Sequence, residues 1–334
     1  MNIVERAASG LPSRPAEASV LWRTVIPGAR AHGLWIDPDG DRVLVSDGWG
    51  VAFSALRLRA LSLEDGRELT SVRLGNAPRT MALETQGAWL AATDTKLFRL
   101  DRKSLKVTTK WTTRVPRYSD DLVVGGGYAH TANHAAPALH SIDLETGAVK
   151  RRLLENDVRV HASRGRLIAI CGDGGVWSAD FGLATAPKRI AQAPPVCATA
   201  TDGHGGLWLS LGQGLVREPS KVFRAEPTPW LGVVADAAFN DLLSVDLGAL
   251  FWDFAVSSDA RRISVITVAP RGEKNAVASF RTSNYDCEGW LRAPAGFEVQ
   301  RVSPDRKLGF ATKPLDGEDV SAVELICFGL SRAG

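Results

Sequence analysis

Cysteine is scarce in this chain of 334 residues, which contains only four, together with two methionines and three tyrosines. The cysteines are Cys171, Cys197, Cys287 and Cys327. No two of them stand in a C-x-x-C spacing, which speaks against a zinc ribbon or a thioredoxin-like redox pair. They are also too few for a disulfide scaffold, so we expect reduced thiols in the core, with a disulfide as the alternative.

Long apolar runs and a strong charge of one sign are missing too. No window approaches the roughly 18 continuous apolar residues of a membrane-spanning helix. The first 20 residues hold no apolar run of signal-peptide length, so we expect a cytoplasmic protein without membrane contact. The net charge of +3 is too small to indicate nucleic-acid binding by itself.

The motifs of several enzyme classes are absent. The sequence has neither the G-x-S-x-G turn of α/β-hydrolases nor a phosphate-binding G-x-x-x-x-G-K-[ST] loop. The glycines at 125–127 are read as a turn because no βαβ unit surrounds them, and 173–175 lacks the ligand spacing of a calcium loop. His130 and His134 are four residues apart, but the local pattern is strand and loop rather than helix. We interpret them as surface or turn histidines and predict no metal site and no cofactor.

What the chain does contain is a repeated phrase. A turn built on Asp-Pro-Asp, Ser-Ser-Asp or Ser-Pro-Asp precedes a short apolar strand at 36–45, 256–265 and 302–310. Proline and glycine in such turns favour tight hairpins. A period of about 40 to 45 residues with short strands is typical of a β-propeller blade.

This period divides the chain into blades. The first blade begins at Ala31 and the last at Phe297. The blades between them span 78–116, 117–156, 157–194, 195–226 and 251–294. The hairpins around 64–66 and 145–147 repeat the same turn within their blades. The last blade lacks a fourth strand, and the strand at 19–25 has no blade of its own. We therefore predict an all-β, seven-bladed β-propeller, with six or eight blades as alternatives, closed by the N-terminal strand.

The expected organisation is a flexible lead-in over 1–17, indicated by Gly10, Pro12 and Pro15, and a single propeller over 18–334. The phrases at 172–177 and 202–210 resemble the D-G-x-G-x-L-W phrase of bacterial sensor-type propellers. The Ser-Pro-Asp phrases resemble those of the WD40-like and YVTN β-propeller superfamily. This resemblance covers most of the chain and implies a propeller fold without implying one function.

One segment, at about 227–250, does not fit the repeat. Several of its apolar residues stand at helical spacing, which predicts an inserted amphipathic helix or a long ordered loop. Such an insert either seals one face of the ring or binds a partner, and the third alternative is an error in the strand count at this point. The candidate partner-binding residues are Trp230, Phe239, Leu242, Leu243 and Phe251.

Polar residues near the start of each blade are expected to line the central channel. The candidates are His32, Arg79, Asp120, His161, Asp253 and Arg301. They either bind a small polar ligand or metal, as lactonase and lyase propellers do, or they hydrogen-bond the backbone and water.

Two basic stretches, at 96–117 and 150–166, lie near Trp111 and Tyr118. They are either solvated strand faces or a surface for nucleic acid or an acidic protein, with the aromatic rings as stacking platforms. Because no catalytic constellation stands out, we predict a non-catalytic protein-interaction scaffold, a subunit of a larger bacterial assembly. The alternatives are a channel-mouth enzyme of the lactonase or lyase type and a nucleic-acid-associated propeller.

Overall fold

The computed structural model describes most of the chain. The described residues are 2–27, 33–38, 40–46, 57–75, 78, 80–93, 96–112, 119–133, 138–154, 158–163, 165–171, 173–212, 216–217, 223–224, 228–234, 240–268, 274–315 and 322–330. All of the regular elements in these ranges are β-strands. Within them no helix is long and apolar enough to cross a membrane.

Four consecutive antiparallel sheets of four strands each make up the first part of the fold. The β4 sheet contains β4 (Gly33–Ile36), β5 (Arg42–Ser46), β6 (Arg57–Ser62) and β7 (Glu68–Arg73). The β8 sheet contains β8 (Thr80–Leu83), β9 (Trp89–Ala92), β10 (Leu97–Leu100) and β11 (Val107–Trp111). The β12 sheet contains β12 (Ser119–Gly125), β13 (Tyr128–Asn133), β14 (Ala138–Asp143) and β15 (Val149–Leu153). The β16 sheet contains β16 (Val158–Ser163), β17 (Arg166–Cys171), β18 (Gly175–Ala179) and β19 (Lys188–Gln192).

A nine-stranded sheet follows, and its longest strand joins two four-stranded units. The β20 unit contains β20 (Val196–Thr201), β21 (Leu207–Leu211), β24 (Thr228–Val234) and the first part of β25 (Asp241–Val256). The β26 unit contains the last part of β25 with β26 (Arg262–Thr267), β27 (Ala276–Arg281) and β28 (Cys287–Arg292). A separate hairpin pairs β22 (Val216–Arg217) with β23 (Phe223–Arg224).

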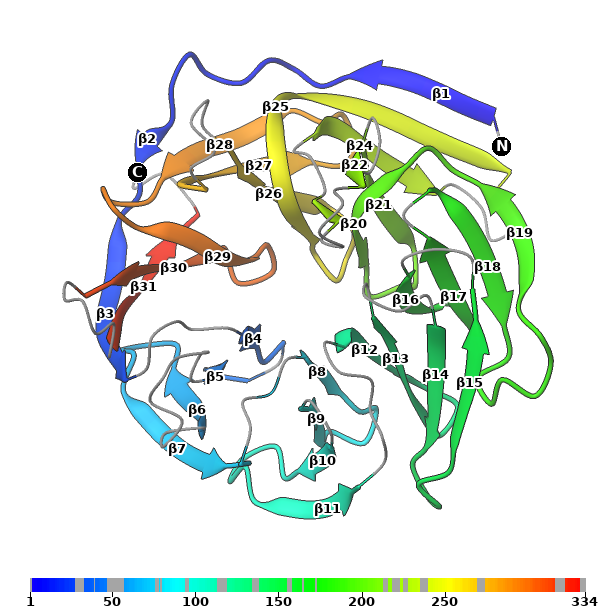
Figure 1. The fold of residues 1–334 in the computed structure, drawn as a ribbon. Coiled ribbons are helices and arrows are strands. Elements are labelled where there is room, and N and C mark those ends of the chain that lie inside the picture. The colour runs from blue at the N-terminus through cyan, green and yellow to red at the C-terminus, as the bar shows by residue number, and fades with distance from the viewer. Residues whose placement is uncertain are drawn as a thin grey trace.

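The last sheet combines the two ends of the chain. The β29 sheet contains β29 (Glu298–Ser303), β30 (Leu308–Pro314), β31 (Ala322–Gly329) and, as its outermost strand, β3 (Val20–Pro27). The strand that we predicted at 19–25 therefore pairs with the final strand of the chain, in antiparallel register from Val20↔Phe328 to Pro27↔Ala322. The sheets follow one another around a common centre, with β4, β8, β12 and β29 near it (Figure 1).

The predicted helix or loop at 227–250 is wrong. Most of this segment forms β24 and β25, which pair with each other from Trp230↔Asp246 to Val234↔Leu242. The predicted fifth blade is wrong in the same way, because its third and fourth strands lie here rather than before residue 226. The physical reason is an alternation from Leu243 to Leu247, in which apolar residues are separated by single polar ones, as in a half-buried strand.

The expectation of a flexible lead-in over residues 1–17 also differs from the structure. Strand β1 (Asn2–Ala7) pairs in parallel with β25, and β2 (Ala16–Glu17) pairs in parallel with β28. The outermost strands of the β20 and β26 units offered unpaired backbone groups, and the N-terminal segment satisfies them. The first 27 residues thus run along the outer edges of three successive sheets (Figure 1).

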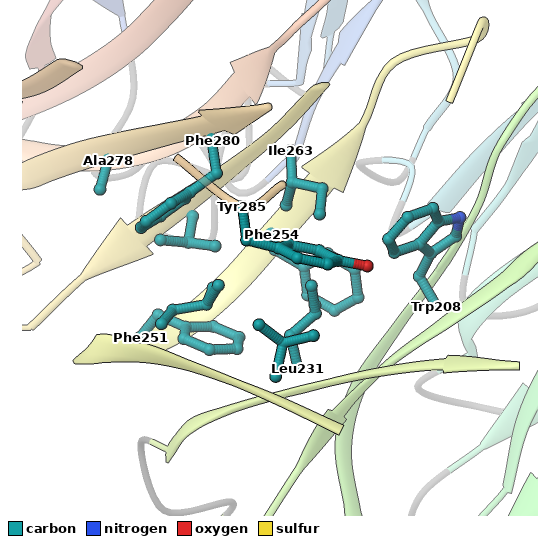
Figure 2. Packing of buried hydrophobic residues seen from close by; sticks show 11 residues of the cluster. Trp208, Leu231, Phe251, Phe254, Ile263, Ala278, Phe280 and Tyr285 are labelled. Carbon is teal, nitrogen blue, oxygen red and sulfur yellow. The ribbon is translucent and has the colours of Figure 1, made fainter. Parts of the chain in front are cut away.

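The core lies between neighbouring sheets. The second strands β9 and β21 are buried at every position, because both faces of a sheet pack against another sheet. Their sequences are therefore mostly apolar instead of alternating. Figure 2 shows one such interface, where Trp208 and Leu231 of the β20 unit pack with Phe254, Ile263 and Phe280 of the next unit.

The predicted hairpin turns explain two glycines. Gly66 and Gly147 have left-handed φ angles of 73° and 75°. Each also lies beneath a tryptophan of the preceding sheet: a Cβ on Gly66 would be 2.5 Å from the Trp22 ring, and one on Gly147 would be 2.8 Å from the Trp111 ring. Only glycine meets both conditions, so these turns can pack closely against a tryptophan in the outermost strand of the preceding sheet.

Candidate functional site

Three of the six predicted channel residues have described side chains: His161, Asp253 and Arg301. His32 and Arg79 lie outside the described residues, and so does the side chain of Asp120. The structure brings the three described residues into contacts between the first strands of neighbouring sheets, rather than into one cluster.

His161 on β16 contacts Thr199 on β20 through Nε2 and Oγ1, 2.6 Å apart. Burial lowers the pKa of His161 to about 4, so the imidazole is neutral at pH 7. Beside it, Asp121 accepts a hydrogen bond from the backbone N–H of Val160 at 3.2 Å. Asp253 on β25 forms an ion pair with Arg301 on β29, with 3.1 Å between Oδ2 and Nη1. These contacts join three pairs of adjacent first strands. The predicted residues His161, Asp253 and Arg301 contact other side chains, which differs from the hydrogen bonds to backbone and water that we gave as the alternative to ligand binding.

His130, which we interpreted as a surface or turn histidine, is fully buried. Its ring lies 5.5 Å from that of Phe181, and burial lowers its pKa to about 4. His134 lies outside the described residues. Among the described residues, no three histidine, cysteine or acidic side chains gather as metal ligands would.

The candidate partner-binding residues form core rather than surface. Leu242 and Phe251 are buried, with exposed fractions of 0% and 1%. Trp230 and Leu243 are half-buried and pack against the adjoining core clusters. Phe239 lies outside the described residues. The expectation that this segment presents a partner-binding surface is therefore wrong for Leu242 and Phe251, because the strand pairing turns them inward.

Two arginines of the basic stretch at 96–117 form contacts within the fold. Arg99 forms two hydrogen bonds to Glu84, at 2.8 and 2.9 Å, and lies over the Trp111 ring. Arg102 binds the carboxylate of Asp37 in the preceding sheet. Trp111 is itself buried, so it is no platform for a stacked base. Tyr118 lies outside the described residues.

Turns between first and second strands, several of which carry the repeated phrases, form a chain of hydrogen bonds on one face of the molecule, which we call the turn belt. It consists of the turns at 37–41, 163–166, 202–206, 257–261 and 303–307, each joining the first and second strands of its sheet or unit. Ser163 Oγ donates to the carbonyl of Gly205 at 2.8 Å. The N–H of Gly203 in turn donates to the carbonyl of Ser258 at 3.0 Å.

The turn belt continues through the last sheet to the first. Asp305 accepts hydrogen bonds from the backbone N–H and the hydroxyl of Ser258, both at 2.9 Å. Arg306 donates to the carbonyls of Pro38 and Gly40 at 3.1 and 2.6 Å, although it stands 266 residues from the latter. The side chains of the phrase therefore join successive sheets, and the belt presents a rigid face.

Two adjoining pockets lie on this face beside the turn at 257–261. They have volumes of about 200 and 250 Å³ and share Arg262 and Glu288. We call them together the arginine pocket. The residues that define it are Arg261, Arg262, Arg281, Thr282, Glu288 and Lys307. The first pocket lies between the β26 unit and the β29 sheet, because Lys307 comes from the turn at 303–307.

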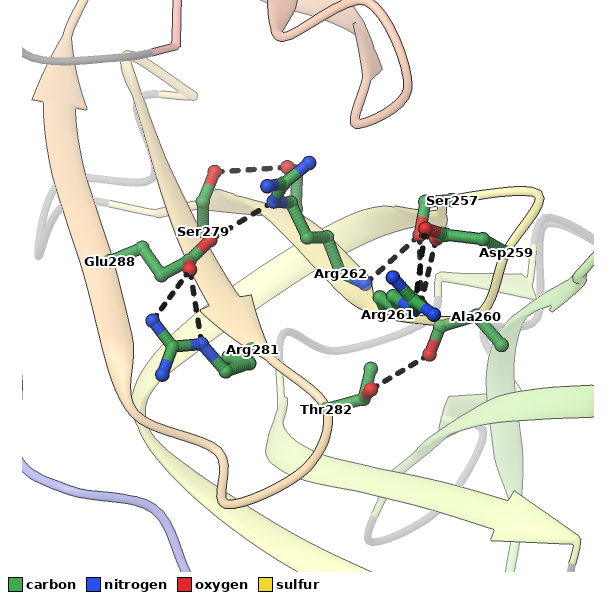
Figure 3. Close-up of polar contacts among 10 residues, drawn as sticks. Ser257, Asp259, Ala260, Arg261, Arg262, Ser279, Arg281, Thr282 and Glu288 are labelled. Carbon is green, nitrogen blue, oxygen red and sulfur yellow. Dashed lines mark hydrogen bonds and ion pairs between the residues drawn. The ribbon is translucent and has the colours of Figure 1, made fainter.

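Strand register explains how the charges of the pocket meet. Arg262 begins β26 and pairs directly with Arg281, which ends β27. The register between β27 and β28 shifts at Glu288, so that Phe280 pairs with Cys287 and Ser279 with Gly289. Glu288 is the extra residue of this bulge, and its carboxylate binds both guanidinium groups (Figure 3).

Sequence reasoning missed this pocket. The only local signal is the Arg261-Arg262 pair at the end of a turn phrase. The other contributors stand about 20 to 45 residues further on, and only the pairing of the strands brings them together. The arrangement can hold an anion, because Glu288 fixes two partly exposed guanidinium groups, one on each side of its carboxylate.

Comparison with known proteins identifies the fold. No protein-family model matches the chain, and no curated protein is recognisably similar in sequence. Among solved structures, the Neurospora crassa Pan2 WD40 domain is similar, with a TM-score of 0.64 and 11% identity, over 97% of this chain and 98% of that one. The β-propeller domain of Myceliophteria thermophila Cps50 (Swd1) gives a TM-score of 0.65 and 13% identity, over 94% of this chain and all of that domain. This chain therefore has the WD40-like β-propeller fold that its repeated phrases resemble.

Proposed function

We propose that residues 18–334 of this WD40-like propeller form one closed ring of seven blades. Five separate four-stranded sheets and the two units that share β25 support the count of seven. Two independent observations support closure. The N-terminal strand β3 completes the last sheet by pairing with β31, and Arg306 of that sheet donates hydrogen bonds to Pro38 and Gly40 of the first sheet.

The function that we propose for this ring is a non-catalytic protein-interaction scaffold. The observation that carries it is the arginine pocket on a face made rigid by the turn belt. A rigid surface with fixed donors binds a partner without first having to order its own side chains. The polar residues of the channel point the same way, since His161, Asp253 and Arg301 are engaged in contacts between sheets.

Membership of a larger bacterial assembly and residence in the cytoplasm are part of this proposal. The resemblance of the D-G-x-G-x-L-W phrases to bacterial propellers supports the first. The cysteines support the second, since Cys171 and Cys327 are buried and burial raises the pKa of Cys327 to about 12. Such thiols behave as core residues rather than as the cross-links of a secreted domain.

Affinity capture of the tagged chain from native extract, followed by chemical cross-linking, tests the proposal. We expect a stoichiometric partner whose cross-links map to lysines of the turn-belt face, such as Lys307. Failure to capture any stoichiometric partner would overturn it. Stoichiometric metal in the purified chain, lost from a His161→Gln/Asp253→Asn variant, would favour the channel enzyme instead.

A further inference from the structure

Building on the proposed scaffold function, we propose that the arginine pocket binds a phosphoryl group carried on a serine or threonine of the partner protein. The arrangement of donors is the first argument. Arg262 binds Glu288 through Nε at 3.2 Å, and Arg281 does so through Nε and one terminal nitrogen at 3.3 and 3.2 Å. Both terminal nitrogens of Arg262 and one of Arg281 have no hydrogen-bond partner within the described part of the chain.

Glu288 thus fixes the two guanidinium groups without using all of their donors. Like charges paired directly across two strands repel, and the bridging carboxylate offsets this repulsion. The two guanidinium groups lie on opposite sides of the Glu288 carboxylate, and each keeps N–H groups that can contact an oxyanion (Figure 3). An arginine pair held in this way is prepared for a ligand with several acceptor oxygens.

The charge balance favours a phosphoryl group over a carboxylate. Among the described residues that line the two pockets, four side chains are cationic and one, Glu288, is acidic. Arg261 also forms an ion pair with Asp259 at 3.8 Å, so an excess of two positive charges remains. A phosphoserine carries close to two negative charges at pH 7 and three acceptor oxygens, whereas a carboxylate carries one charge. The hydroxyl of Ser283 adds a neutral donor at the rim of the second pocket.

Size and lining favour a protein side chain over nucleic acid. Volumes of about 200 and 250 Å³ lie below the roughly 300 to 1,000 Å³ of pockets that hold whole small molecules. No aromatic ring is among the described lining residues of either pocket, whereas proteins that bind single-stranded nucleic acid stack bases on aromatic side chains. One phosphorylated side chain and its neighbours fit these dimensions.

The walls of the pocket are held in place by polar contacts. Ser264 and Ser279 share a buried hydrogen bond of 2.9 Å beneath Arg262. Thr282 Oγ1 donates to the carbonyl of Ala260 at 2.7 Å, which ties the two turns of the unit together (Figure 3). The turn that carries Arg261 is itself closed by Ser257 and Asp259. Little side-chain ordering is therefore left for the binding step.

Binding of short peptides with a fixed phosphoserine and randomised flanks, measured by affinity selection and calorimetry, tests the inference. We expect selection of phosphoserine peptides over the same peptides with serine or glutamate. The Arg262→Gln/Arg281→Gln variant is expected to lose about tenfold or more in affinity. Arg262→Lys/Arg281→Lys, which keeps the charge but removes the fork, should bind with intermediate affinity.

The matched control is Arg67→Gln/Arg73→Gln, which removes the same charge at exposed positions of the β4 sheet and should bind like the wild type. Urea midpoints of all variants verify that they fold. Equal binding of serine and phosphoserine peptides, preference for a single-stranded oligonucleotide, or undiminished binding by the glutamine variant would overturn the inference. If native partners remain bound after phosphatase treatment, the proposed scaffold function is supported and the proposed phosphoryl ligand is wrong. If no partner is captured at all, the scaffold function itself fails.

Discussion

At the scale of single residues, the acidic and serine side chains of the turn phrases act as joints between sheets. Asp37 accepts a hydrogen bond from the Gly40 N–H at 3.0 Å and binds the guanidinium group of Arg102 in the next sheet. Asp305 performs a similar task for Ser258. The phrase that marks the repeat in the sequence is therefore also what holds consecutive repeats together.

Replacement of Asp37 tests this role. The Asp37 side chain is 2% exposed and that of Arg102 is 28% exposed. Asp37→Ala therefore removes the buried carboxylate that pairs with the partly buried Arg102 charge. We expect a loss of about 3 kcal/mol in the free energy of unfolding, measured by urea denaturation. The control is Asp65→Ala, at an exposed turn position outside the belt, which should cost clearly less. Equal urea midpoints for Asp37→Ala and the wild type would contradict the role.

Three buried histidines predict acid sensitivity. Burial lowers the pKa values of His130, His140 and His161 from the usual 6.5 to about 4. Between these two pH values the unfolded chain binds protons that the folded chain does not. Their contribution to stability is therefore complete above pH 6.5 and is lost as the pH falls towards 4, by about 1.4 kcal/mol per pH unit for each histidine.

Urea midpoints measured across this pH window check the effect. The His161→Gln variant should show a shallower dependence of stability on pH, since one of the three groups is gone. A wild-type stability that is constant between pH 6.5 and 4, or a slope that His161→Gln leaves unchanged, would show that these imidazoles are not neutral and buried.

At the scale of elements, the short strands could be predicted from the sequence, whereas the long strand β25 could not. The short strands and their turns follow from proline, glycine and aspartate at the hairpins, and from the pairing need of the last sheet. The prediction of a helix or loop at 227–250 is wrong because apolar residues four apart satisfy helical spacing. The alternation from Leu243 to Leu247 indicates a strand instead. No local pattern marks a strand of 16 residues that serves two units.

The arginine pocket was even harder to predict from the sequence than β25. Its geometry depends on the exact register of β26, β27 and β28, and on a bulge that turns Glu288 towards Arg262. A bulge is one extra residue in one of two paired strands. Nothing in the local sequence shows that Glu288, rather than a neighbour, is this extra residue. Long-range pairing, rather than residue type, creates the site.

Truncation of the N-terminus distinguishes the roles of β1, β2 and β3. All residues of β1 and β2 are exposed, so deleting residues 2–17 removes edge hydrogen bonds and the partial packing of Ala8 and Leu11. We expect a folded monomer whose stability falls by a few kcal/mol at most, because each such hydrogen bond contributes about 1 kcal/mol net.

Deletion of residues 2–27 removes β3 as well, including the buried Trp22 and Ile26. This variant should fail to fold as a monomer, as judged by circular dichroism and gel filtration, since the β29 sheet then exposes an unpaired apolar edge. If it folds as well as the shorter deletion does, β3 is not a structural part of the ring.

At the scale of the whole molecule, stability depends on joining sheets that are far apart in the sequence. Each sheet buries its faces only against its neighbours, so an interrupted ring would expose two of these faces. The contact between the first and last sheets, through Trp22 and Phe310 with Val43 and Val45, buries the faces that would otherwise be left. In the closed ring that we propose, closure supports both the core and the face that carries the arginine pocket.

Hydrogen exchange resolved to single amides tests closure most directly. If β3 closes the ring, the amides of residues 20–27 that pair with β31 exchange as slowly as those of residues 322–329, and both open only with global unfolding. Rapid exchange over residues 20–27 while residues 322–329 stay protected would contradict the closed ring.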